Sequence, residues 1–177
     1  MTGARTGLGR RGALAAVGLV ALERVAELVV ARRNERWAHE HGGVEHGAGH
    51  YPVMVALHSG LLAAIPAEAM LRDRQPPRAW PALLATCLAT QGLRWWCIRT
   101  LGPRWNTRVI VLPGTPPITA GPYRLLPHPN YVAVVAEGAA LPLLAGATWT
   151  AAVFSAADAV LLRHRIRVED AALGRTP

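Results

Sequence analysis

The chain has 177 residues, of which 51% are hydrophobic, and it carries a formal net charge of +8 at pH 7. This length suits one domain, and the apolar composition with a positive mean hydropathy of +0.21 favours an integral membrane protein over a soluble one. The basic residues are all Arg and stand mostly between apolar segments, so membrane topology explains the charge better than nucleic-acid binding does. Residues 1–177 are therefore expected to form a single integral membrane domain.

Five apolar segments follow one another along the chain, and each is close to the roughly 20 residues that cross a bilayer. Glu23, Arg24 and Glu27 interrupt the first segment, and no small-residue cleavage site follows, so we interpret it as a retained helix rather than a signal peptide. The last two segments are short and read as a helical hairpin. The predicted fold is all-α, a polytopic membrane bundle of about five transmembrane helices. The segments are 12–31, 52–71, 79–98, 130–146 and 148–163.

Three polar connections, 32–51, 72–78 and 99–129, separate these segments. With five spans, the first and third connections lie on the same side as the C-terminus. That side holds ten Arg against six on the other, which predicts that it faces the cytoplasm. The six include Arg5. The unusual polar motifs described next all belong to this cytoplasmic side.

One such motif is "GPYRLLPHPNY" at 121–131, which leads into the fourth apolar segment. Pro122 fixes a turn, and Pro129 suits the first turn of a helix, so His128 is predicted at the helix entrance. The second motif is "RIRVEDAAL" at 165–173, in which Arg165 and Glu169 are four residues apart and share one helix face. Charged groups at the edge of a membrane are costly unless they meet polar partners, which indicates a site.

Together these motifs resemble the isoprenylcysteine carboxyl methyltransferase family of integral membrane enzymes that use S-adenosyl-L-methionine. The stretches 23–58 and 91–114 are similar to its bacterial branch, which includes methyltransferases associated with type III polyketide synthases that methylate alkylpyrones. The chain departs from the family pattern at Pro127, where a base is usual, and at Asp170, where a second Glu is usual. The resemblance implies a bacterial cytoplasmic membrane enzyme with a cytosolic cofactor pocket and a lipophilic acceptor.

The resemblance also implies residue roles, with the cofactor-binding part at about 99–175. Arg165 or Arg124 would meet the cofactor carboxylate, Glu169 a ribose or ammonium group, and the backbone of 111–113 the adenine. The predicted cofactor-binding residues are Val111, Leu112, Pro113, Gly121, Tyr123, His128, Pro129, Tyr131, Glu137, Arg165, Glu169 and Asp170. The candidate catalytic residues are His128, Arg94 and Glu169, although an already anionic acceptor needs no strong base.

The acceptor is expected to meet polar residues of the first connection and of the third apolar segment, where Arg94 would neutralise an anionic oxygen. The predicted acceptor-binding residues are Asn34, Glu35, Gln91, Arg94 and Trp95. Other polar residues inside apolar segments, His58 and Asp158 among them, are either packed in a polar interior or part of an acceptor cavity. The four His of the first connection are expected to belong to a polar cap rather than to a metal site.

Two other classes of protein compete with the methyltransferase. Sterol-type membrane reductases share a related His-Pro-x-Tyr pattern but bind NADPH, whose extra phosphate would disfavour the acidic pair Glu169–Asp170. A membrane scaffold without catalysis would not need Arg165 and Glu169 beside the helix entrance. For the methyltransferase, alkylpyrone- or alkylresorcinol-like polyketides are the first expected acceptors and an isoprenylcysteine carboxylate the second.

Overall fold

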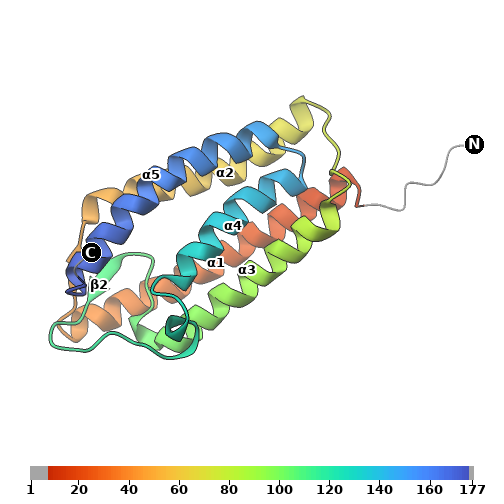
Figure 1. Cartoon of the computed structure of the whole chain (residues 1–177). Coiled ribbons are helices and arrows are strands. Elements are labelled where there is room, and N and C mark those ends of the chain that lie inside the picture. The colour runs from red at the N-terminus through yellow and green to blue at the C-terminus, as the bar shows by residue number, and fades with distance from the viewer. Residues whose placement is uncertain (1–7, 176–177) are drawn as a thin grey trace, which may run out of the picture.

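The structure is a computed structural model that describes residues 8–175, so Arg5 of the charge count lies outside it. Five helices, of which α4 is the shortest, form an elongated bundle (Figure 1), which confirms the expected all-α class. Helix α2 lies beside α5, and α3 lies beside α4. The helices are α1 (Arg10–Glu40), α2 (Tyr51–Leu71), α3 (Trp80–Leu101), α4 (Pro129–Leu144) and α5 (Thr148–Ala172).

The apolar core fills the part of the bundle that is remote from the strands. Small residues let the helices approach closely there, and a Cβ added at Gly138 of α4 would lie 2.4 Å from the Phe154 ring of α5. The α4–α5 hairpin turns at Gly146, where φ is +76°. Fully or nearly fully buried members of this core are Ala13, Val17, Ile65, Ala69, Cys87, Leu141, Leu144 and Phe154.

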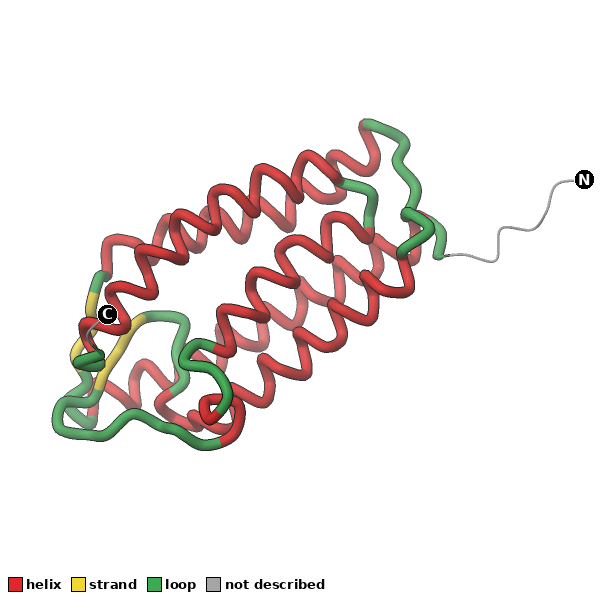
Figure 2. The backbone as a smooth tube through the Cα atoms, viewed as in Figure 1, coloured by secondary structure: helices red, strands yellow, loops and turns green. Residues whose placement is uncertain are grey.

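The opposite end of the bundle carries the irregular segments. Strand β1 (Val44–His46) pairs antiparallel with β2 (Val109–Val111), so the connection after α1 is joined to the connection after α3 (Figure 2). Short 3-10 turns complete this end, and the last of them contains the "GPYR" turn expected from the sequence. The turns are η1 (Ala48–His50), η2 (Gly102–Arg104) and η3 (Gly121–Arg124).

Two helices are longer than their apolar segments predicted. Helix α1 continues to Glu40 and α5 to Ala172, so much of the connection 32–51, expected to be a polar connection, is helical. The added turns contain Arg, Glu and Ala, which are good helix formers. A search for apolar segments detects only the hydrophobic part of a helix and misses such polar turns. Helix α4 begins at Pro129, as the position of that proline predicted.

Within residues 8–175, one helical stretch, Ala48–Leu71, is long and apolar enough by itself to cross a membrane. Helix α4 is apolar but has only 16 residues. Helices α1, α3 and α5 carry buried charged residues that lower their mean hydropathy. The number of spans therefore stays a prediction from the sequence.

Candidate functional site

A cavity of about 140 Å³, the end cavity, lies at the end of the bundle that carries the strands. Its walls come from segments far apart in the sequence, namely the C-terminal turns of α1 and α5, strand β2, turn η3 and the first turn of α4. The two motifs singled out in the sequence therefore meet here. Pro129 at the first position of α4 fixes the helix entrance and so brings His128 to the cavity wall.

The wall contains a connected set of polar side chains centred on Tyr131. The Nε of Arg165 donates to the Tyr131 hydroxyl at 2.9 Å, and its Nη2 donates to the Thr107 carbonyl at 2.6 Å. The Tyr131 hydroxyl in turn donates to the Glu169 carboxylate. Arg165 and Glu169 lie one helical turn apart on α5, which lets one tyrosine contact both.

His128 links the two acidic residues of the second motif. Its Nε2 lies 3.0 Å from Asp170 Oδ1, whereas its Nδ1 lies 3.5 Å from Glu169 Oε1 without the alignment of a hydrogen bond. The Glu169 carboxylate, with help from Asp170, raises the pKa of His128 above its ordinary value of 6.5 although burial opposes this. Burial alone would raise the pKa of Glu169, but the contacts with His128 and Tyr131 outweigh it and lower that pKa below 4.5.

Several polar atoms of the end cavity have unmet hydrogen-bonding capacity. Five lining residues each bury a nitrogen or oxygen that has no hydrogen-bond partner within residues 8–175. Three of these atoms, in Arg108, His128 and Arg175, lie within 4.0 Å of a carboxylate oxygen, so Trp105 Nε1 and Asn130 Oδ1 are the ones that a polar ligand or water would complete. The atoms belong to Trp105, Arg108, His128, Asn130 and Arg175.

A second cavity of about 180 Å³, the inner cavity, lies deeper in the bundle between α1, α2, α4 and α5. Much of its wall is aliphatic, and its polar members include His58, Arg94 and Asp158. The two cavities share a wall, so a molecule in one would lie next to a molecule in the other. The shared residues are Trp105, Asn106, Asn130, Tyr131 and Arg165.

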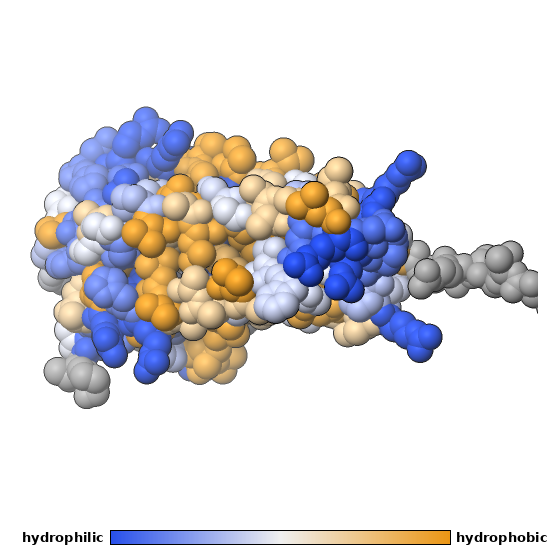
Figure 3. Space-filling view, turned by 90° about the horizontal axis from the view of Figure 1, so that it is seen from above, coloured by the Kyte–Doolittle hydropathy of each residue, from blue (hydrophilic) through white to orange (hydrophobic). Residues whose placement is uncertain are grey.

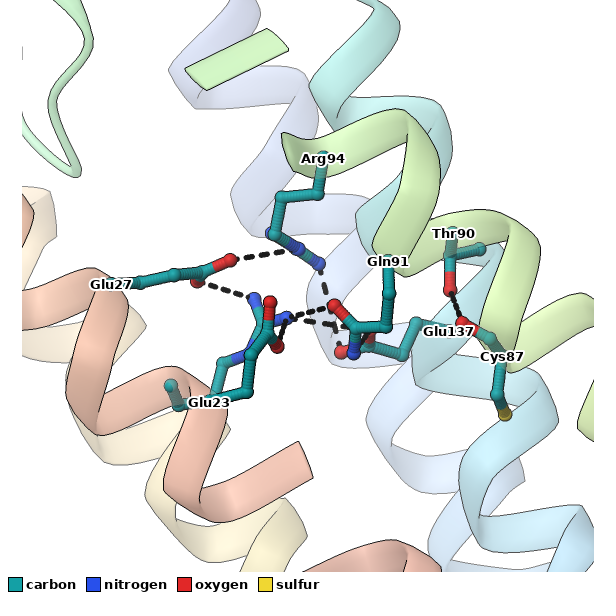
Figure 4. A network of polar contacts seen from close by, with 8 residues as sticks. Glu23, Glu27, Cys87, Thr90, Gln91, Arg94 and Glu137 are labelled. Atoms are coloured by element: carbon teal, nitrogen blue, oxygen red, sulfur yellow. Dashed lines mark hydrogen bonds and ion pairs between the residues drawn. The ribbon is translucent and has the colours of Figure 1, made fainter. Parts of the chain in front are cut away.

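Beside the inner cavity, charged residues of α1, α3 and α4 form the mid-bundle cluster (Figure 4). Arg24 lies 2.7 Å from Glu27 and donates to Gln91 at 2.9 Å, and Gln91 donates to Glu137 at 2.8 Å. Arg94 completes the ring at 3.3 Å from Glu27 and 3.6 Å from Glu137. The members are Glu23, Arg24, Glu27, Gln91, Arg94 and Glu137.

The structure gathers many of the predicted cofactor-binding residues around the end cavity. Those that line it are Val111, Leu112, Tyr123, His128, Tyr131, Arg165 and Glu169. Those that do not line it are Pro113, Gly121, Pro129, Glu137 and Asp170. Asp170 does not reach the cavity surface but contacts the Nε2 atom of His128, and Glu137 belongs to the mid-bundle cluster. Arg124 is exposed and lines neither cavity, which leaves Arg165 as the nearer cation to the site.

The predicted acceptor-binding residues are dispersed. Arg94 lines the inner cavity, and Gln91 lies beside it in the mid-bundle cluster. Asn34 instead donates to the carbonyls of Gly102 and Trp105 and so anchors α1 to turn η2. Two further members lie away from both cavity walls. Glu35 pairs with Arg108 at 3.2 Å, and Trp95 packs beside Ile98.

Five polar residues of the end cavity escaped the sequence analysis as candidates: Arg104, Asn106, Arg108, Asn130 and Arg175. Asn130 lies inside the quoted "HPNY", where its position beside Tyr131 was an available signal. Arg108 is held by Glu35, by Glu45 at 2.7 Å and by the Tyr51 ring, contacts that depend on the pairing of β1 with β2. Within residues 8–175, the His of 39–50 do not gather with other ligands into a group that could hold a metal ion.

The polar end cavity adjoins the partly aliphatic inner cavity. This arrangement suits a protein that brings a polar molecule and a lipophilic molecule together. Residues 83–175 match the model of the isoprenylcysteine carboxyl methyltransferase (ICMT) family. Over 157 residues the chain is 39% identical to the Bacillus subtilis (strain 168) "Uncharacterized protein YpbQ", an alignment that covers 89% of this chain and 94% of that protein. No solved structure matches the chain.

The chain therefore belongs to the ICMT family, whose members are membrane-bound methyltransferases. This confirms the family identified from the "GPYRLLPHPNY" and "RIRVEDAAL" motifs. The narrower likeness to enzymes associated with polyketide synthases stays a prediction.

Proposed function

We propose that the protein is an S-adenosyl-L-methionine-dependent O-methyltransferase that acts on a lipophilic acceptor within the membrane. The observation that carries this proposal is the common wall of the two cavities, in which Tyr131 and Arg165 face both sides. A transfer reaction needs the two reactants held in contact and away from bulk water, and adjacent cavities meet that need. The whole chain acts as one domain, with the cofactor-binding part at about 99–175.

The end cavity offers the chemistry that the cofactor needs. S-adenosyl-L-methionine carries a carboxylate, a cationic ammonium and sulfonium, a ribose and an adenine. Arg165 and Arg108 suit the carboxylate, and Glu169, held ionised by its contacts, suits the ammonium or the ribose hydroxyls. The edge formed by Val111 and Leu112 suits the adenine. When bound, the cofactor supplies an activated methyl group, and the role of these residues is to bind and orient it.

The bundle also has the surface of a membrane protein. Figure 3 shows an apolar band between hydrophilic groups at the two ends of the molecule. Every long helix contributes exposed large apolar side chains, which favours five spans even though the charged interior lowers the hydropathy of single helices. Examples are Leu22 of α1, Val53 of α2, Leu88 of α3, Val135 of α4 and Val160 of α5.

The excess of Arg at the end that carries the strands supports a cytoplasmic position for the end cavity in the bacterial inner membrane. The cofactor then enters from the cytosol, whereas the acceptor reaches the inner cavity from the bilayer. An alkylpyrone or alkylresorcinol, produced by a type III polyketide synthase, fits a wall that combines aliphatic and polar residues. An isoprenylcysteine carboxylate is the second candidate acceptor.

The test is a comparison of nucleotides on the purified full-length protein in lipid nanodiscs. We expect S-adenosylhomocysteine to bind and NADPH not to bind, and we expect labelled S-adenosyl-L-methionine to methylate a lipophilic component of a bacterial lipid extract. Binding of NADPH alone would favour a reductase, and binding of neither nucleotide would leave a scaffold. Glu169→Ala should weaken S-adenosylhomocysteine binding, whereas Glu40→Ala, an exposed carboxylate at the end of α1, should not.

A further inference from the structure

The inner cavity contains two ionisable side chains, His58 and Asp158, that form no ion pair with any of residues 8–175. Asp158 of α5 is only 4% exposed, yet it has no hydrogen bond or ion pair with any of residues 8–175. His58 of α2 lines the same cavity. An unpartnered carboxylate inside an apolar bundle is costly, and such residues in membrane segments are typically functional. By contrast, the charges of the mid-bundle cluster contact one another.

The hydrogen bonding of His58 fixes what its free nitrogen can do. Its Nδ1 lies 2.9 Å from the carbonyl oxygen of Met54 one turn earlier. A carbonyl oxygen only accepts, so Nδ1 carries the proton and Nε2 of the neutral ring is an acceptor. Nε2 has no hydrogen-bond partner among the described residues. The ring is also held edge-on against Phe154, 5.3 Å between centroids, which limits its rotation.

His58 and Asp158 occupy matching depths in the bundle. His58 lies seven residues into α2 from Tyr51, and Asp158 lies seven residues before Arg165 on α5, which is about 10 Å of helix rise between the Cα atoms in each case. The two side chains line the same cavity without forming an ion pair with each other. With Asp158 ionised, both side chains present hydrogen-bond acceptors to the inner cavity, and a group that binds between them supplies the donors.

Resting on the proposed function, we propose that His58 and Asp158 form a subsite that binds a hydroxyl group of the methyl acceptor. The acceptor is then a hydroxylated lipid, with one oxygen at the shared wall for methylation and a hydroxyl deeper in the inner cavity. A carboxylate is disfavoured at this subsite, because it has no proton to donate and is repelled by Asp158, whereas the arginines of the same cavity, Arg24 and Arg94, are already paired with Glu27 and Glu137. The structure therefore favours the phenol- or enol-type acceptor over the isoprenylcysteine carboxylate.

The experiment compares two probes that share one tail, 5-pentadecylresorcinol and its dimethyl ether, by equilibrium binding to the full-length protein in nanodiscs. We expect the diol to bind at least about tenfold more tightly than the diether, as a hydrogen bond to a charged or buried acceptor predicts. In His58→Phe and Asp158→Leu, which replace a buried polar group with an apolar one, the preference should fall below about threefold. Asp73→Asn, an exposed carboxylate at the other end of the bundle, should leave it unchanged.

Equal binding of the two probes to the unmodified protein would overturn the proposal even if the variants do not fold. A preference that survives both substitutions would overturn it as well. S-adenosylhomocysteine binding, measured in the same samples, should not change in either variant, because His58 and Asp158 do not line the end cavity. If S-adenosylhomocysteine fails to bind while the diol preference depends on the two residues, the proposed function fails and the subsite stands.

Discussion

The end cavity and the mid-bundle cluster are both rich in charge, but they use it differently. In the mid-bundle cluster, side chains from three helices contact one another in a closed ring around Arg24 and Arg94. In the end cavity, Trp105 Nε1 and Asn130 Oδ1 have neither a hydrogen-bond nor an ion-pair partner in the described chain. The first arrangement is that of a structural network, because every charged side chain in it has an ion-pair partner within the cluster, even though four of them also bury an atom without a hydrogen bond. The second has binding capacity left over for a ligand.

Breaking the mid-bundle cluster should give the largest effect, and the effect should be on stability. Glu137→Ala removes the carboxylate that accepts from Gln91 and lies near Arg24 and Arg94, which leaves buried cations with fewer partners. Loss of one partner of a buried ion pair costs about 3–5 kcal/mol, so Tm should fall by roughly 10 °C or more in thermal unfolding of the reconstituted protein.

S-adenosylhomocysteine affinity of Glu137→Ala, measured well below its Tm, should stay within about threefold of the unmodified protein because Glu137 does not line the end cavity. An unchanged Tm with a lost affinity would reverse the assignment and return Glu137 to the cofactor site, as the sequence predicted.

The reciprocal result is expected for Arg165 in the end cavity. Arg165→Met removes the hydrogen bonds to Tyr131 and to the Thr107 carbonyl and the cation that suits the cofactor carboxylate. We expect S-adenosylhomocysteine affinity to fall about 30- to 100-fold in isothermal titration, since hydrogen bonds to charged groups contribute about 1.5–3 kcal/mol each. Arg163→Met, which replaces an exposed Arg on the same helix, is the matched control and should bind normally. Equal losses in both variants would point to general charge rather than to the site.

For the end cavity and the mid-bundle cluster, the helices and turns were easier to predict from the sequence than the contacts between their side chains. Proline at 129 and glycine at 146 marked the ends of helices, and the spacing of Arg165 and Glu169 placed both on one face of α5. The partners of Glu137 were not predictable, because α4 has no strong amphipathic period that shows which helix each side chain faces.

The same limit applies to the walls of the end cavity. Arg108 reaches its position through the pairing of β1 with β2, and strands of three residues leave too short a pattern to detect. The sequence assigned acceptor-binding roles to Asn34 and Glu35 because residues 32–51 were expected to form a polar connection. In the structure, helix α1 continues through both residues, and their side chains contact residues 102–108.

The pH dependence of stability should distinguish the end cavity further. The pKa of His128 is raised in the folded protein, so its stabilising contribution is complete below pH 6.5 and is lost as the pH rises through the folded pKa. The pKa of Glu169 is lowered, so its contribution is complete above pH 4.5 and is lost as the pH falls through the folded pKa. Both are present between about pH 4.5 and 6.5, where these two groups contribute most to Tm.

The variant His128→Gln should lose the decline on the alkaline side of this window and should weaken the decline on the acid side, because His128 is the largest of the contacts that lower the pKa of Glu169. Thermal unfolding at closely spaced pH values measures both arms. His39→Gln, at an exposed histidine near the end of α1, is the control and should keep both. An alkaline arm that persists in His128→Gln would assign it to another group.

The smallest effect is expected at the other end of the bundle, where Glu68 of α2 caps α5. Its carboxylate accepts from the backbone N–H groups of Trp149 and Thr150, at 3.1 and 2.7 Å, and from the Thr150 hydroxyl at 2.7 Å. These are N–H groups of the first helical turn that no intrahelical carbonyl can reach, so Glu68→Ala should cost about 1 kcal/mol and lower Tm by roughly 2–4 °C. Cofactor and acceptor affinities should not change, because Glu68 lines neither cavity. A loss of ligand affinity in this variant would show that the hairpin turn transmits strain to the end cavity, and the separation between a structural network and a binding wall would then fail.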